Sequence, residues 1–212
     1  MQRVLLTLGD SWPEGAELNF GDQRYGELIQ TALGYDKFYN YGSGGASNED
    51  MQYQLQRYIA ESHEPGNRVT AVFFLTNPAR TAHFPRWFSW DPPLDHKLKE
   101  LYVHFHRREH EVMRSSATVS TLQTWCASLG FADYYFSGWV RYPTWLPGVD
   151  TSKIWAQGNE TAADWFGASK HNGEHLLDVE DNVYIRPNFA HPNQLGHELI
   201  ADRLIGWISQ AR

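Results

Sequence analysis

The sequence predicts an α/β fold, a three-layer α/β/α sandwich around a roughly five-stranded parallel sheet. Two observations predict it. Short, continuous apolar runs alternate with segments whose apolar residues recur at helical spacing, and such runs are typical of strands covered on both faces. Alternation of strands and helices implies right-handed crossovers between parallel strands. The length of 212 residues suits one domain, so we expect a single domain over residues 1–212.

Apolar runs predict the strands. The clearest is Val-Thr-Ala-Val-Phe-Phe-Leu at residues 69–75, and Val-Leu-Leu-Thr-Leu at residues 4–8 is expected to form a central strand. Shorter runs predict strands at residues 38–41 and 132–136.

Helical periodicity predicts the covering layers. Residues 22–33 end at Gly34, a common helix stop, and Ser47-Asn48-Glu49-Asp50 has the form of a helix cap. Further helices are expected at residues 94–114, 118–129 and 193–209. The last helix is expected to turn these apolar side chains inward: Leu195, Leu199, Ile200, Leu204, Trp207 and Ile208. Two aromatic-rich loop insertions are expected, near residues 78–93 and 138–172.

Composition and charge exclude several classes of function. The formal net charge of −7 argues against a nucleic-acid-binding protein, which needs a basic face. No run of Lys or Arg indicates a membrane surface, and no apolar stretch approaches the ~20 residues that span a bilayer. The first apolar run is too short for a signal peptide, and Cys126 alone cannot form an internal disulfide. We expect a cytoplasmic or otherwise soluble protein.

Polar residues follow the predicted strands. Gly9-Asp10-Ser11 follows the first strand, a Gly-rich loop at residues 42–47 the second, and Asn77 the third, while His191 opens the last helix. In open α/β sheets, ligands bind at the carboxyl ends of the strands. A hydroxyl, an imidazole and hydrogen-bond donors are the groups that acyl transfer requires. Taken singly, Ser11 or His191 could simply cap a helix and Asn77 could be a loop residue.

These segments resemble the four sequence blocks of the SGNH (GDSL-type) hydrolases, in family order and over nearly the whole chain. The matching segments are Gly9-Asp10-Ser11, the loop from Gly42 to Ser47, Leu75-Thr76-Asn77, and the stretch from Asn188 to His197. The resemblance implies a flavodoxin-like winding of the sheet and serine esterase activity without a metal or organic cofactor.

The resemblance also implies residue roles. Ser11 would be the nucleophile and His191 the general base, and the oxyanion hole would comprise the Ser11 and Gly45 amides and the Asn77 side chain. One position departs from the family, because Asn188 stands where the family has the aspartate that supports the histidine. Three explanations stay open: a Ser–His dyad supported by the Asn188 carbonyl, a substitute acid such as Asp178 or Asp181, or a weak or altered enzyme.

The expected substrate is a short-chain carboxylic ester, with O-acetyl groups on carbohydrates preferred because aromatic loops suit sugar faces. Asp10, Trp12, Trp87 and Trp139 are the candidate substrate-binding residues, although the aromatic residues could instead form a small core beneath the loops. The expected partner is a small-molecule or carbohydrate ester, with no nucleic acid and no membrane, and the oligomeric state stays open. The alternative function is a catalytically silent glycan-binding module on the same fold.

A second motif competes with this interpretation. His106-Arg-Arg-Glu109-His110 fits the H-x-x-E-H pattern of inverted zinc proteases, with Glu174 or Glu180 as a third ligand. The flanking arginines favour an ordinary solvated helix face. We likewise expect His171 and His175 to lie at the surface and His197 to be a packing residue.

Overall fold

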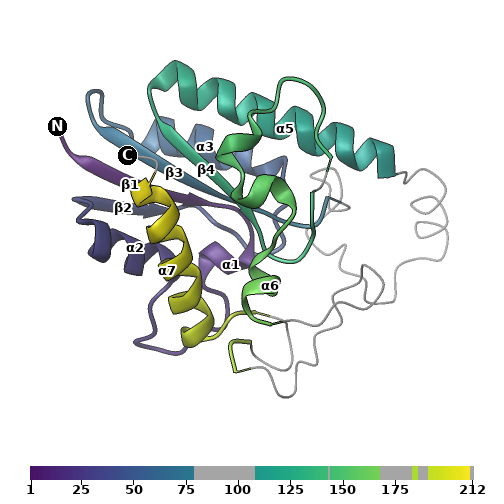
Figure 1. The fold of residues 1–212 in the computed structure, drawn as a ribbon. Helices are drawn as coiled ribbons and strands as arrows, with labels where there is room; N and C mark the ends of the chain where they lie inside the picture. The colour runs from purple at the N-terminus through teal and green to yellow at the C-terminus, as the bar shows by residue number, and fades with distance from the viewer. Residues whose placement is uncertain (79–107, 143, 168–182, 186–190, 211–212) are drawn as a thin grey trace, which may run out of the picture.

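A computed structural model describes residues 1–78, 108–142, 144–167, 183–185 and 191–210. Within these ranges the chain forms a four-stranded parallel sheet in the order β2-β1-β3-β4 (Figure 1). The strands are β1 (Arg3–Leu8), β2 (Lys37–Asn40), β3 (Arg68–Leu75) and β4 (Ala132–Ser137). The central pair β1–β3 is in register from Arg3 opposite Arg68 to Leu8 opposite Phe73. The prediction was of roughly five strands, and beyond β4 the described residues add a single parallel bridge from Tyr135 to Ile154.

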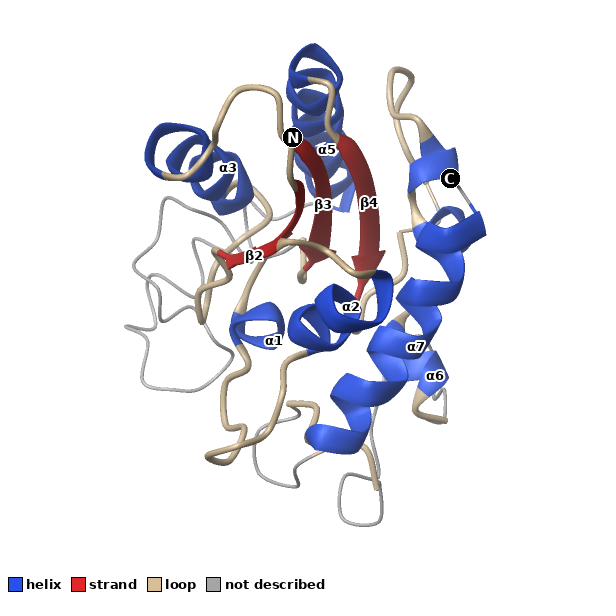
Figure 2. Ribbon diagram, turned by 90° about the vertical axis from the view of Figure 1, so that its left-hand side faces the viewer, coloured by secondary structure: helices blue, strands red, loops and turns tan. Residues whose placement is uncertain are grey.

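Helices cover both faces of the sheet, as the alternation of strands and helices predicts. In Figures 1 and 2, α3 and α5 lie on one face and α1, α2 and α7 on the other. The α-helices are α1 (Ser11–Glu14), α2 (Tyr25–Leu33), α3 (Asp50–Glu61), α5 (Arg108–Leu129), α6 (Ala162–Trp165) and α7 (Gln194–Gln210). Two short 3₁₀ helices, η1 (Thr151–Lys153) and η2 (Trp155–Gly158), lie in the expected loop region after β4.

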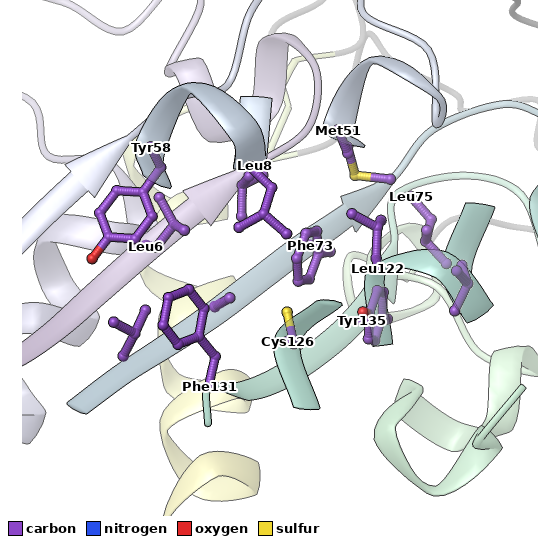
Figure 3. Close-up of a cluster of buried hydrophobic side chains, with 14 of the residues drawn as sticks. Leu6, Leu8, Met51, Tyr58, Phe73, Leu75, Leu122, Cys126, Phe131 and Tyr135 are labelled. Atoms are coloured by element: carbon purple, nitrogen blue, oxygen red, sulfur yellow. The ribbon is translucent and has the colours of Figure 1, made fainter. Parts of the chain in front are cut away.

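Alternate residues of β1 supply two separate cores because successive side chains of a strand point to opposite faces. Leu6 and Leu8 pack with Met51 of α3 and Leu122 of α5 (Figure 3), whereas Leu5 packs on the face covered by α2 and α7. All five of these side chains are fully buried. Burial of each such side chain contributes about 1.5–3 kcal/mol, so the sheet is fixed from both sides.

The structure corrects two predictions about helices. Residues 108–129 form one continuous helix, whereas the sequence predicted a break between residues 114 and 118. Ser115, Ser116 and Thr118, at or beside the predicted break, are all buried and pack as small residues on the inner side of α5. Leu195 was predicted to point inward and is 51% exposed, because it lies in the first turn of α7 at the surface. Ile200, Leu204 and Ile208 are buried, as predicted.

Among the described residues, no helix is both long enough and apolar enough to cross a bilayer.

Candidate active site

The site begins where β1 ends, at Gly9. This residue has a φ of +137°, and a Cβ atom built on it would lie 2.8 Å from both Cβ and the carbonyl oxygen of Phe74. Glycine is therefore required by both the backbone conformation and the close approach of β3. The buried Gln54 side chain of α3 accepts from the Gly9 N–H and donates to the Gly9 carbonyl oxygen, each at 2.8 Å. These contacts fix the backbone immediately before Ser11.

Asp10 connects the start of α1 to the end of β3. Its carboxylate accepts from the backbone N–H of Trp12 at 3.1 Å, as a helix N-cap does, and from the Thr76 hydroxyl at 2.8 Å. Asp10 is only 4% exposed. Burial and these bonds indicate that Asp10 positions the segment that carries Ser11. The substrate contact that the sequence predicted for Asp10 stays a prediction.

Ser11 and His191, which lie far apart in the sequence, meet in the structure. The Ser11 Oγ lies 2.8 Å from Nε2 of His191, within hydrogen-bond distance. His191 precedes α7, whose first turn is capped by Asn193: its side-chain oxygen accepts from the Gly196 N–H at 3.1 Å. Asn193 also donates from its backbone N–H to the Tyr184 carbonyl at 2.9 Å. The two side chains expected to act as nucleophile and base are therefore held in contact from opposite ends of the chain.

The other ring nitrogen of His191 faces a carboxylate that sequence reasoning missed. Nδ1 of His191 lies 3.3 Å from Oε2 of Glu17. Glu17 follows α1 and has a φ of +69°, a left-handed conformation uncommon for a residue with a side chain. No periodicity or motif marks Glu17. Its nearness to Ser11 in the sequence is the one available signal. Asn188, Asp178 and Asp181 lie outside the described residues.

The expected oxyanion donors lie at the same edge of the sheet. The glycine-rich loop follows β2, Ser11 follows β1, and Asn77 follows β3, and these strands are neighbours in the sheet. Gly45 is exposed and has a φ of +75°, which suits glycine. Asn77 is half-buried. The roles of these groups as oxyanion donors stay predictions.

Side chains on both sides hold the glycine-rich loop in place. The Gly42 N–H donates to Asn40 Oδ1 at 2.9 Å, and the Gly44 N–H donates to Glu14 of α1 at 2.6 Å. Asn48 accepts from the backbone N–H of Thr76 at 2.9 Å, which joins the loop to the end of β3. The loop therefore has a fixed position relative to Ser11.

The described aromatic residues near the site are mostly packed against one another. Trp12 is 2% exposed and lies in edge contact with the half-buried Trp139, with ring centroids 5.1 Å apart. Tyr142 is buried, donates to the Thr76 carbonyl and stacks on Trp145. Burial raises the pKa of the Tyr142 hydroxyl, which keeps the proton on this donor. For Trp12 and Tyr142 the core interpretation is favoured over substrate contact. Trp87 lies outside the described residues.

The zinc-protease motif finds no support in the described part of the chain. Glu109 and His110 are exposed at the start of α5, while His106, His171, His175, Glu174 and Glu180 lie outside the described residues. No group of three or more potential metal ligands occurs among the residues that the structure describes. His197 is fully buried, which confirms its prediction as a packing residue.

Comparisons with known proteins bear on the fold. No protein-family model and no curated protein sequence matches the chain. Solved structures do match over almost the full length. The structure of TesA has a TM-score of 0.56 at 12% identity, covering 95% of each chain. The psychrotrophic esterase EstA from Pseudoalteromonas sp. has a TM-score of 0.51 at 13% identity, covering 98% of this chain and 97% of EstA. The acetyl xylan esterase AlAXEase has a TM-score of 0.51 at 12% identity, covering 97% of this chain and 99% of that one.

Identities this low establish similarity of fold and leave activity to be argued from the site. Three observations agree: the strand order, the two helical layers, and the match over nearly the whole length of three solved structures, two of which are esterases. The chain therefore has the α/β fold of the SGNH hydrolases.

Proposed function

We propose that the chain is a serine esterase that hydrolyses short-chain carboxylic esters. The observation that carries this proposal is the 2.8 Å contact between Ser11 Oγ and His191 Nε2 at the carboxyl edge of the sheet. A serine within hydrogen-bond reach of an imidazole is the arrangement that activates the hydroxyl for attack on a carbonyl.

The proposed reaction has two halves. Ser11 Oγ bonds to the ester carbonyl carbon as its proton passes to His191 Nε2, and the tetrahedral oxyanion then collapses. The alcohol leaves with the proton from His191, and the acyl group remains on Ser11. Water then attacks the acyl-enzyme, giving its proton to His191, and the carboxylic acid leaves as Ser11 recovers a proton. The Ser11 and Gly45 amides and the Asn77 side chain are the proposed oxyanion donors.

The proposed substrate class is O-acetyl groups on carbohydrates. The similarity of fold to an acetyl xylan esterase supports this class, as does the partly exposed Trp139 after β4. A silent glycan-binding module is the alternative, but a binding module has no need for a serine held against an imidazole. That contact favours the enzyme.

The test is release of acetate from p-nitrophenyl acetate and from acetylated xylose, comparing the native protein with Ser11→Ala. We expect turnover by the native protein and a fall of at least ~10³-fold in Ser11→Ala, because the nucleophile is lost. Equal turnover by both proteins would exclude Ser11 as nucleophile. No turnover by either protein, with native circular dichroism and unchanged binding of acetylated xylose, would favour the silent module.

A further inference from the structure

We propose that Glu17 is the carboxylate that orients His191, in place of an acid at position 188. The inference rests on the proposed esterase function and assigns to that site a positioning residue from the segment that also carries Ser11. The sequence resemblance gives no reason to expect it, because the family aspartate lies just before the histidine, where this chain has Asn188.

The contact itself is the first argument. Glu17 Oε2 and His191 Nδ1 are 3.3 Å apart, and both atoms are shielded from solvent. Within the described residues, neither atom has a hydrogen-bond partner. In the part of the chain that the structure describes, Glu17 is the one carboxylate paired with His191. A buried oxygen and a buried ring nitrogen that face each other without other partners are suited to share a proton, and such contacts often shorten when substrate binds.

The backbone around Glu17 gives the second argument. The backbone carbonyl oxygen of Ser11 accepts from the N–H groups of Gly15 and Ala16 at 3.1 and 3.0 Å. These bonds hold the end of α1 close to the backbone of Ser11. The Leu18 N–H then closes a turn onto the Gly15 carbonyl at 3.2 Å, with Glu17 at its third position and a positive φ. That position of a type II turn normally takes glycine.

Residues in uncommon backbone conformations persist where surrounding contacts hold them there, and such residues cluster at active sites. Here a glycine would satisfy the turn, but it would remove the one carboxylate that the described structure places against His191. The presence of glutamate in a conformation that favours glycine therefore points to the carboxylate as the functional group.

The chemistry explains what the carboxylate does. Nε2 of His191 can accept the Ser11 proton only if the ring carries its own proton on Nδ1. A carboxylate at Nδ1 holds the ring in that tautomer and stabilises the imidazolium that forms during attack, without itself taking the proton. The amide of Asn188 could not supply this negative charge. Glu17 would supply it in a chain that has asparagine at the position of the family aspartate.

The experiment compares kcat and KM for p-nitrophenyl acetate in the native protein, Ser11→Ala, Glu17→Gln and Glu17→Asp. We expect Glu17→Gln to lower kcat by about 10²- to 10⁴-fold with little change in KM, since the acid-to-amide change in the serine protease template costs about 10⁴-fold. Glu17→Asp keeps the negative charge on a shorter side chain, so its kcat should lie between those of the native protein and Glu17→Gln. Glu198→Gln is the matched control, because it removes an exposed carboxylate from α7 and should leave kcat unchanged.

Two further measurements keep the result decisive. Nitrogen-15 NMR of His191 should show the Nδ1–H tautomer in the native protein and a mixture of tautomers in Glu17→Gln. Thermal unfolding of Glu17→Gly should give a midpoint equal to or above that of the native protein, because glycine relieves the turn while activity is lost.

If native and Ser11→Ala differ as proposed but Glu17→Gln stays within threefold of native, Glu17 is not the orienting acid and the esterase function stands. If the native protein hydrolyses no ester, the proposed function fails, and the NMR experiment alone decides the inference. A mixture of tautomers in the native protein would overturn it.

Discussion

At the residue scale, the position of Ser11 depends on buried polar contacts two residues before it. Gln54 both donates to and accepts from the backbone of Gly9, and the Ser43 N–H shares the Gly9 carbonyl at 3.1 Å. The Gly9 N–H, in contrast, has Gln54 as its partner. A buried N–H that loses its partner keeps the cost of its desolvation, which is about 1–3 kcal/mol.

Gln54→Met should therefore lower the free energy of unfolding by about 1–3 kcal/mol, because methionine has a similar shape but cannot bind the Gly9 N–H. It should also reduce kcat of the proposed esterase reaction, since the segment that carries Ser11 loses a contact that holds it. Urea unfolding followed by circular dichroism measures the first effect. Gln56→Met, at an exposed position of the same helix, is the control. Equal stability of the two variants would show that the Gly9 contact contributes nothing.

Sequence patterns predicted Ser11 and His191 but not Glu17, for a physical reason. Ser11 follows β1 and His191 precedes α7, so the hydrophobic pattern marks their places and the family resemblance suggests their roles. Glu17 reaches His191 through a turn whose positive φ no pattern of side chains specifies. A residue whose backbone conformation departs from local preference, as that of Glu17 does, is the kind that sequence patterns are expected to miss.

At the element scale, α5 shows the same limit of prediction from sequence patterns. Apolar runs predicted the four strands to within two residues at each end, because burial on both faces leaves a continuous signal. The sequence predicted two helices over this stretch, and the Ser and Thr residues at the predicted break are of types that favour caps and turns over helix interiors. Tertiary packing overrides this preference: Ser116 is buried, and its hydroxyl accepts from the Leu146 N–H at 3.1 Å.

The continuity of α5 can be tested at Ala117, which is exposed and lies between the two predicted helices. Ala117→Pro should lower the free energy of unfolding by about 3 kcal/mol, because proline removes a hydrogen bond and clashes with the preceding turn. Ala117→Gly is the control and should cost only about 1 kcal/mol. If the segment were a junction between two helices, the proline variant would be no less stable than the glycine variant.

At the scale of the whole molecule, His197 joins two helices of the layer that carries the site. It lies in α7, stacks on Tyr25 with ring centroids 5.8 Å apart, and accepts at Nδ1 from the backbone N–H of Tyr25 at 3.2 Å. That N–H belongs to the first turn of α2, where Arg24 provides no side-chain bond to it. His197 therefore caps α2 from α7, and it can do so only as a neutral ring, since a protonated ring has no acceptor.

This arrangement makes the stability of the fold depend on pH. Burial lowers the pKa of His197 from 6.5 to about 4. Above pH 6.5 the ring is neutral in both the folded and unfolded states, so its ionisation does not affect stability. Between about pH 6.5 and pH 4, His197 is protonated in the unfolded chain but neutral in the folded chain. The free energy of unfolding therefore falls as the pH falls through this window. The loss between pH 7.5 and pH 5 should be about 2 kcal/mol from this residue.

The measurement is the free energy of unfolding at both pH values for the native protein and for His197→Asn. Asparagine places an acceptor near the position of Nδ1 but does not titrate, and carboxylate effects common to both proteins cancel in the difference. We expect the variant to be less stable than native at pH 7.5, because a smaller side chain leaves a gap beside Tyr25, yet to lose about 2 kcal/mol less on acidification. Parallel pH curves for the two proteins would mean that His197 takes up its proton without unfolding, and the link between α2 and α7 would then tolerate a charged ring.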